Sequence, residues 1–374
     1  MDHRQPAVAT GSDVGARAAG VTRAPPVARR VRPPSDYAQL AVEIRAAGLM
    51  ERRRGFYLLL GVALTLGLGV VMSLAVALGD SWWQLATAVL LAFVLAQFGF
   101  LGHDAAHRQV LSSSSGNEWL ARVLSTGVVG LSYGWWTHKH SRHHSAPNQV
   151  GRDPDIAPGG LVFTPEDAAR RSGAGRWMGA HQGALFFPLL LLEGLNLHAA
   201  SLRAVVVNKE LAWRRLELAL LLTRLGGYVA LVVLALDPLK AAAFLTVQLG
   251  VFGVLLGGAF APNHKGMPIV PRGSRVDFLR RQVLMSRNIR GGAFLTAAMG
   301  GLNYQIEHHL FPSMPRANLR HARPLVRAYC TSMDVPYAET GLVASYAIVV
   351  RYLNQVGLGQ RDPFTCPMVE QYRS

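Results

Sequence analysis

The sequence has very little cysteine: Cys330 and Cys366 are the two thiols among 374 residues. They are too few for a disulfide framework or for an iron–sulfur cluster held by this chain alone, and they favour a reducing, cytosol-facing environment. Charged residues are also scarce, at 16%, whereas hydrophobic residues make up 50%. That balance is too apolar for most soluble domains and too polar for a chain lying wholly in lipid. It predicts membrane spans joined to a sizeable water-facing part.

Acidic residues are outnumbered, with 22 Asp and Glu against 38 Lys and Arg, giving a net charge of +16. A basic excess can serve nucleic acid, an anionic membrane surface or acidic partners. The sequence contains no RNA- or DNA-binding motif, and its basic residues cluster beside hydrophobic segments. The charge asymmetry of membrane proteins explains this placement, so we expect no nucleic-acid partner.

The N-terminal segment lacks the apolar core of a secretory signal. Residues 1–34 are rich in Ala, Arg, Gly and Pro, and we expect them to form a disordered basic arm. An amphipathic helix is expected next, beginning at Ser35 and ending at Gly48.

Two pairs of long apolar runs predict four transmembrane helices, because a bilayer core of about 30 Å needs roughly 20 helical residues. Asp80 with Ser81, and Asp237 with Pro238, form turns so short that only antiparallel hairpins fit. The predicted spans are 56–79, 84–102, 216–236 and 239–261.

Three features of the apolar pattern are less regular. Arg224 lies inside the third span, where a charge costs about 2.5–3.5 kcal/mol, so we expect it to snorkel or to line a polar cavity. The apolar stretches 123–131 and 186–192 are too short or too broken to span comfortably. We expect both to lie in the interface or to roof a lipid-binding tunnel.

Arginine is abundant in the N-terminal arm, in residues 103–215 and from residue 262 onward, whereas the two turns have no basic residue. The positive-inside rule therefore places these three regions and both termini in the cytoplasm. The predicted fold is an all-α integral membrane protein: two hairpins with a helical cytosolic cap formed by 103–215 and 262–345, followed by a tail, 346–374.

Most of the 13 histidines fall into groups beside the predicted spans. Their positions are His103 and His107; His140, His143 and His144; His264; and His308 and His309, the last pair led by Gln305. Positions three and four apart share one helix face. A pair spaced like the first group is expected by chance about 0.4 times in such a chain, but a group like the second only about 0.016 times.

Clustered imidazoles predict metal binding. Neutral imidazole suits iron, copper and zinc, and eight nitrogens exceed what one ion can hold, so two metals are implied. The absence of thiolate from the groups argues against a structural zinc site. Carboxylates are sparse there, since only Asp104 and Glu307 lie within the clusters. Asp104 is a possible ligand, or it orients a histidine from outside the ligand set.

Five motifs make the sequence resemble the membrane fatty-acid desaturase family from about residue 36 to 345: HDAAH, WWTHKHSRHHSAPNQ, RDPDI, FAPNHKGMP and LNYQIEHHLFPSMPR. The glutamine-led third group resembles the front-end and acyl-lipid branch, and the motif sequences as a whole resemble those of actinobacterial acyl-CoA desaturases. The resemblance implies a multi-pass protein of a bacterial plasma membrane. It implies that O2 and two non-haem irons remove two hydrogens from the acyl chain of an acyl-CoA or acyl-lipid.

By motif position, the resemblance implies eight iron ligands, and Asn263 or Gln305 acting directly or through water. These ligands are His103, His107, His140, His143, His144, His264, His308 and His309. The His-Pro-Gly-Gly string of a fused haem domain does not occur. Electrons are therefore expected from a separate ferredoxin or flavin/iron–sulfur reductase.

Other functions fit part of the pattern. A hydroxylase, ketolase or sphingolipid-type oxygenase would use the same scaffold, and a metal transporter or zinc-dependent lipid hydrolase would also need clustered histidines. A transporter requires ligands at membrane depth, whereas these lie at span ends and in loops. The remaining histidines are expected outside the site: His3, His138, His181, His198 and His321. We expect Trp135 and Trp136 to anchor the interface rather than to line a tunnel.

Overall fold

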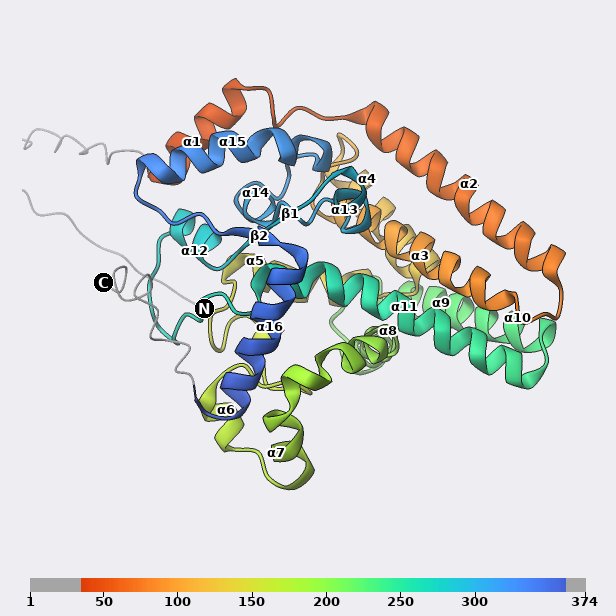
Figure 1. Ribbon diagram of the computed structural model, residues 1–374. Coiled ribbons are helices and arrows are strands. Elements are labelled where there is room, and N and C mark those ends of the chain that lie inside the picture. Colours follow the sequence, from red (N-terminus) through yellow and green to blue (C-terminus); the bar gives the residue numbers. More distant parts are fainter. Residues whose placement is uncertain (1–34, 361–374) are drawn as a thin grey trace, which may run out of the picture. The chain divides into compact units, whose positions relative to one another are not determined.

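The computed structural model describes residues 35–360 (Figure 1). This part of the chain is mostly helical, with one pair of short parallel strands, β1 (Asn288–Arg290) and β2 (Glu339–Gly341). The all-helical prediction is therefore correct except for this strand pair. The arm predicted for residues 1–34 lies outside the described residues, as do His3 and Cys366.

The first hairpin consists of α2 (Arg54–Leu78) and α3 (Gln84–Ala106). α2 begins two residues before its predicted span, and α3 continues four residues beyond its own. α2 ends at Gly79, whose φ of 54° favours glycine. The Gln84 side-chain amide donates to the carbonyls of Ala75 and Gly79 at 2.6 and 2.8 Å. It thereby satisfies carbonyl groups that the end of a helix leaves without partners.

The second hairpin begins with α9 (Arg214–Leu221), η3 (Leu222–Gly226) and α10 (Gly227–Ala235), and returns through α11 (Pro238–His264). η3 is a π-helical turn that contains Arg224. Arg224 donates from Nε to the carbonyl of Val128, at 2.6 Å, and its guanidinium lies 4.8 Å from the ring centroid of Tyr228. Its polar partner is thus a backbone carbonyl.

The two hairpin turns are in contact. Lys240 lies 2.7 Å from the carboxylate of Asp80 and 3.1 Å from that of Asp237. The backbone N–H of Asp237 also donates to Asp80 at 3.0 Å. One ammonium group therefore joins both turns at the end of the hairpins opposite the histidines.

The apolar stretch 186–192 belongs to a much longer helix, α8 (Gln182–Val207). α8 packs closely on α11 where Gly194 meets Gly253, because a Cβ on either glycine would collide with the backbone of the other helix. The expectation of a short, broken segment was therefore wrong, whereas the expected place beside a tunnel agrees with the structure, because Phe186 and Leu190 line a cavity next to the histidines. Between residues 35 and 360, five helical segments are long and apolar enough to cross a membrane: α2, α3, α8, α9 to α10, and α11.

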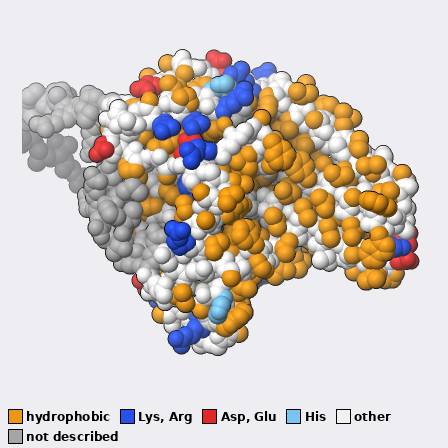
Figure 2. Space-filling view, viewed as in Figure 1, with side chains coloured by type: hydrophobic (Ala, Val, Ile, Leu, Met, Phe, Trp, Pro, Cys, Tyr) orange, Lys and Arg blue, Asp and Glu red, His pale blue; other side chains and the backbone are white. Residues whose placement is uncertain are grey.

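Apolar side chains face outward on the hairpins. α2 has Tyr57 and Val71 as its buried residues and exposes most of its other side chains. Figure 2 shows hydrophobic side chains over α2, α10 and α11, whereas lysine and arginine gather over the other elements. An outward apolar surface of this extent is typical of a membrane protein.

The remaining elements form a cap at the histidine end. They include α4 (Ser114–Arg122), η1 (Val123–Val129), α5 (Tyr133–Ser145), η2 (Pro154–Ile156), α6 (Pro165–Ala169), α7 (Gly173–Ala180), α12 (Phe278–Leu284), α13 (Ala293–Ala298), α14 (Gln305–Leu310) and α15 (Arg316–Ser332). The predicted amphipathic helix is α1 (Asp36–Ala46), which buries Leu40 and Ile44 in one core with residues of α12 and α15.

The predicted boundary between cap and tail, after residue 345, falls inside a helix. α16 (Leu342–Gly357) buries Val349, Tyr352 and Leu353 in a core shared with Phe186 of α8. The side-chain amide of Gln182 also donates to the carbonyl of Leu353, at 2.8 Å. The folded region therefore extends at least to the end of α16, because its apolar face completes that core.

Candidate metal centre

Four helices bring the eight predicted histidines together. His103 lies in the last turn of α3, and His107 is the C-terminal capping residue of that helix. α5 has three histidines on one side, α11 ends in His264, and α14 contains His308 and His309. Spacings of three and four residues place each group on one helix face, so that helix packing gathers all of them.

Five of these histidines form one compact group, which we call the five-histidine cluster. It contains His103, His107, His140, His144 and His308, and one nitrogen of each lies within 4.8 Å of those of the others. The Nε2 atom of His140 lies 2.9 Å from that of His107 and 3.0 Å from that of His144. Nitrogens from three separate segments, α3 with its cap, α5 and α14, thus surround one point.

The other three, His143, His264 and His309, form the three-histidine cluster, again with nitrogens within 4.8 Å of one another. The two clusters are neighbours: the rings of His144 and His309 stack with their centroids 4.3 Å apart. Two adjacent nitrogen-rich clusters can hold two ions, as the count of imidazoles predicted.

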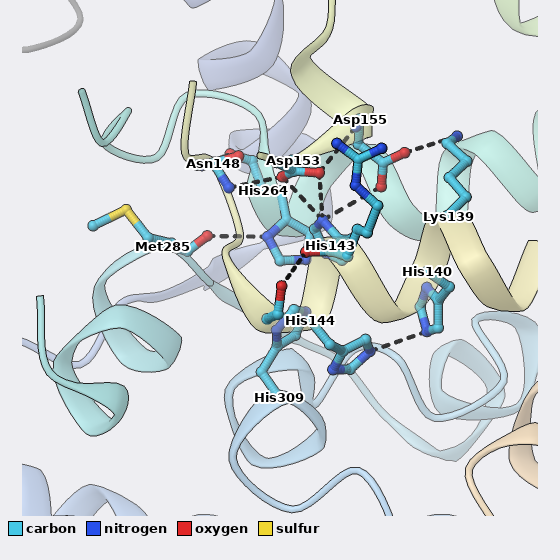
Figure 3. Close-up of polar contacts among 12 residues, drawn as sticks. Lys139, His140, His143, His144, Asn148, Asp153, Asp155, His264, Met285 and His309 are labelled. Carbon is cyan, nitrogen blue, oxygen red and sulfur yellow. Dashed lines mark hydrogen bonds and ion pairs between the residues drawn. The ribbon is translucent and has the colours of Figure 1, made fainter. Parts of the chain in front are cut away.

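Each histidine of the three-histidine cluster is fixed through Nδ1 (Figure 3). His143 donates to the carboxylate of Asp153 at 3.0 Å, and His264 donates to the backbone carbonyl of Met285 at 3.0 Å. His309 donates to the Gln282 side-chain carbonyl at 2.9 Å. These bonds select the tautomer that leaves Nε2 available for a metal.

Several buried nitrogens support metal binding. The Nε2 atoms of His103, His308 and His309 are buried and form no hydrogen bond within the described part of the chain. Burying a polar atom without a partner is costly. Burial, followed by the neighbouring histidines, lowers the pKa of His140, His144, His308 and His309 well below the ordinary value, which keeps these rings neutral. Neutral imidazole is the form that binds metal.

His143 differs from those four. Burial opposes its protonation, but the carboxylates of Asp153 and Asp155 outweigh burial and raise its pKa. The same carboxylate pair lies on its Nδ1 side, with Asp155 3.4 Å away. The basicity of this ring is therefore set by two acids from the loop after α5.

Asp104 is turned away from both clusters. One carboxylate oxygen lies 2.6 Å from Arg316, and the other is 3.5 Å from Nδ1 of His103. This arrangement matches the second of the two roles considered for Asp104, in which it orients a histidine from outside the ligand set.

Gln305 and Asn263 lie beside the three-histidine cluster. The Gln305 side-chain amide donates to Nε2 of His264 at 2.9 Å, and Asn263 lies 3.4 Å from the Gln305 side-chain carbonyl. The Oδ1 atom of Asn263 is buried without a hydrogen-bond partner among the described residues. Gln305 therefore contacts this cluster directly, and Asn263 is its neighbour through Gln305.

A cavity of about 340 Å³ adjoins both clusters. His103 and His140 line it from one cluster, and His143 and His264 line it from the other. The cavity then passes between α3, η1, α8 and α11, where its lining is mostly apolar: Gly99, Phe100, Val129, Leu131, Leu190, Leu197, Leu256 and Phe260. It has the size and apolar lining of a small-molecule site.

The other part of the cavity lining is polar. Lys139 pairs with the Asp155 carboxylate at 2.8 Å, and each side chain is about a third exposed, at 37% and 33%. Lys265 donates to the backbone carbonyl of Asp155 at 2.8 Å and lies over the ring of Phe163, 4.2 Å from its centroid. A ligand in the cavity would meet charge near the surface and hydrocarbon in the interior.

Most other histidines lie where the sequence placed them. His138 is exposed, and neither it nor His198 belongs to a histidine cluster. His198 bonds to the carbonyl of Gly130 at 2.9 Å. The expectation for the tryptophans was wrong, because Trp135 and Trp136 both line the cavity, and Trp136 stacks on His140 with the ring centroids 4.3 Å apart.

Four residues of the site were not assigned roles from the sequence: Asp153, Asp155, Gln282 and Met285. The two aspartates lie in the RDPDI motif, ten and twelve residues beyond His143, which was the available signal. Gln282 and Met285 carry no such signal, because they act on histidines through hydrogen bonds across long sequence separations.

Comparison with known proteins gives consistent matches. The family model described as fatty acid desaturase matches residues 80–341. A Delta(6)-fatty-acid desaturase of Caenorhabditis elegans is 28% identical, over 88% of this chain and 76% of that protein. An acyl-lipid (9-3)-desaturase of Physcomitrium patens is 31% identical over 73% of this chain and 53% of its own length. A Delta 8-(E)-sphingolipid desaturase of Kluyveromyces lactis is 28% identical over 89% of this chain and 61% of its own.

Proposed function

Because the chain belongs to the fatty acid desaturase family, we propose that it inserts a double bond into an acyl chain using O2 and two iron ions. As a desaturase it is an oxidoreductase. The observation that carries the proposal is the apolar cavity, which reaches histidines of both clusters at once. An acyl chain lying in it would pass close to both metal positions, with two neighbouring carbons beside the site.

The five-histidine cluster would hold one iron and the three-histidine cluster the other, the latter with Gln305 or Asn263 as a further oxygen donor. Bound iron would supply the activation of O2 that side chains alone do not provide. The hydrogen bonds on Nδ1 orient the rings, and the apolar cavity walls exclude water from the oxidised carbons.

The polar part of the cavity suits the carrier end of the substrate, either coenzyme A or a lipid headgroup. Lys139 and Lys265 present ammonium groups beside the ligand histidines, while the cavity interior is apolar. We therefore propose that the carbonyl end of the acyl chain lies at the lysines and the methyl end between α3 and α8.

We propose four spans rather than five, with α8 lying in the interface. His103 and His264 lie in adjacent clusters and line one cavity, so α3 and α11 end on the same side, and the hairpin of α9 to α11 also begins there. The first turn of α9 is fixed near the start of α5, because the Glu217 carboxylate of α9 accepts from Ser132 at 2.6 Å. α8 therefore begins and ends on that side, which the positive-inside rule makes the cytoplasm.

Expression in a host that lacks the activity, together with a ferredoxin and its reductase, tests the proposal. Gas chromatography of the host fatty acids should show a new acyl chain two mass units lighter than its precursor. An unchanged profile with an active donor would count against desaturation, and a product 16 units heavier would indicate a hydroxylase.

His143→Ala should abolish the product and lower the iron content of the purified protein, because it removes a nitrogen from the smaller cluster. The matched control is His138→Ala on the same helix, whose ring is exposed and outside both clusters. Retained product in His143→Ala would contradict the ligand assignment while leaving the desaturase function standing.

A further inference from the structure

Four arginines surround the end of α5, on a surface that we call the arginine patch: Arg142, Arg152, Arg272 and Arg281. The first three are exposed. The Arg272 guanidinium lies beside Gly151, 2.9 Å from the position a Cβ would take there. Arg281 donates to the backbone carbonyl of Ser145 at 3.0 Å. Burial, followed by the charge of Arg152, lowers the pKa of Arg281, and the Asp277 carboxylate partly opposes this.

No carboxylate in the described residues forms an ion pair with any of the four. Asp277, which lies in the same segment, pairs with Arg280 at 3.3 Å, and Arg280 also pairs with Asp36 at 2.7 Å. Asp277 is a counter-charge near Arg281 but forms its ion pair with Arg280. Like charges gathered without ion-paired carboxylates repel each other, and an acidic partner would relieve that repulsion. Guanidinium groups also bind carboxylates with two parallel hydrogen bonds.

The patch is joined to the three-histidine cluster by the residue after Arg281. Gln282 is fully buried, donates to the backbone carbonyl of His144 at 3.0 Å and accepts from Nδ1 of His309 at 2.9 Å. The surface around Arg281 is thus one buried amide away from histidines of both clusters.

None of the four arginines lines the cavity. α5 presents Trp136, Lys139 and His140 to the cavity, while Arg142 is on its exposed side. The substrate carrier already has its own polar surface at Lys139. A binding partner at the arginine patch would therefore approach the metal centre from a different side than the substrate.

The proposed reaction needs electrons that its substrates do not supply. Converting –CH2–CH2– and O2 into –CH=CH– and two H2O consumes two electrons and two protons. We propose that the arginine patch docks an acidic, reduced iron–sulfur protein, which gives up one electron in each of two encounters while the protons come from water. This inference rests on the proposed function and deepens it by assigning the docking surface for the donor.

Charge reversal on the full-length protein in nanodiscs tests the docking surface. The variant is Arg142→Glu with Arg152→Glu, and the probe is an acidic plant-type [2Fe–2S] ferredoxin kept reduced by its reductase. The apparent KM for ferredoxin should rise about tenfold at low salt, with a much smaller change in kcat at saturating donor. The difference should shrink at about 0.5 M salt, where surface charges are screened.

The matched control reverses two exposed arginines of α15, Arg320→Glu with Arg327→Glu, and changes the net charge equally. An equal rise in KM for both variants would overturn the assignment, because it would reflect net charge alone. A rise in KM for the acyl substrate instead of ferredoxin would also overturn it, as would no change at all.

Turnover driven by dithionite, which needs no protein donor, distinguishes weaker ferredoxin docking from damage to the metal site. If the patch variant loses dithionite-driven turnover and iron as fully as ferredoxin-driven turnover, the substitution has damaged the site and the docking assignment fails. If the unaltered protein makes no product with either reductant, the proposed function fails. An active unaltered protein with an unaffected patch variant contradicts only the docking surface.

Discussion

The two histidine clusters lie side by side, but they are built differently. The five-histidine cluster draws its nitrogens from α3, α5 and α14 and includes His107, at the end of its helix. The three-histidine cluster has fewer rings, and every one of them is fixed through Nδ1 by another part of the chain: Asp153, Met285 or Gln282. The five-histidine cluster has more nitrogens than one ion needs, whereas the three-histidine cluster depends on the correct orientation of each ring.

This difference predicts which substitutions each cluster can tolerate without losing its ion. An ion among five imidazoles keeps four when one is removed, whereas an ion among three keeps two and must rely on Gln305 or Asn263. Loss of a hydrogen bond outside the ligand set should likewise matter more where each ring has a single fixed partner.

The largest contrast is expected from removing one ring of each cluster. His309→Ala should abolish desaturation and lower bound iron from about two per chain to about one, because only two imidazoles remain. His107→Ala should lower activity but retain more iron. Iron analysis of both variants, with circular dichroism to verify the helices, measures this. Equal iron loss in the two variants would contradict the asymmetry between the clusters.

A smaller effect is expected at Asp153. Asp153→Asn removes the carboxylate that orients His143 and should weaken iron binding or activity about 10- to 100-fold, as is typical of residues that hold a metal ligand. Asp237→Asn, in a hairpin turn, is the control for loss of a carboxylate. Iron titration compares the iron affinities of the two proteins. An unaltered affinity in Asp153→Asn would contradict the role of Asp153 in orienting His143.

Much of the fold and of the histidine arrangement followed from the sequence, because both depend on local spacing. The hairpins follow from apolar runs and two-residue turns, and the groups on α5 and α14 follow from intervals of three and four residues. Gln282 was not predictable in this way, since it bonds a carbonyl 138 residues away.

α8 was missed for a different reason. Pro188 and Glu193 interrupt its apolar pattern, and such interruptions normally indicate a break. In the structure Glu193 lines the polar part of the cavity beside Lys139. The interruption therefore reflects the cavity that the helix helps to form, and a single sequence does not contain that information.

Altering Gln305 should change the iron affinity of the three-histidine cluster about tenfold. Gln305 is one candidate for the fourth donor that this cluster needs beyond its three imidazoles. Gln305→Glu should retain the second iron, since a carboxylate offers an oxygen in the same place, whereas Gln305→Leu should lose it. If both variants bind iron like the unaltered protein, Gln305 serves only as a hydrogen-bond partner of His264, and Asn263 becomes the remaining candidate.

The smallest expected effect is a difference in how the clusters release metal on acidification. A proton and a metal compete for Nε2 of a histidine whose Nδ1 already holds a proton. The Asp153 and Asp155 carboxylates raise the pKa of His143, whereas burial lowers the pKa of His309 beside it and of His140 and His144 in the other cluster. His143 is therefore the first ring at which the proton displaces the metal as the pH falls.

Lowering the pH in the presence of a chelator should therefore remove iron in two steps, the first from the three-histidine cluster. Iron content and circular dichroism measured at each pH follow the release and verify that the helices persist. His309→Ala should lack the first step, because its smaller cluster is already empty of metal. A single step in the unaltered protein would mean that the two clusters release their ions together. The contact between the rings of His144 and His309 would then couple the clusters, and the different hydrogen-bond partners of their histidines would not make them independent.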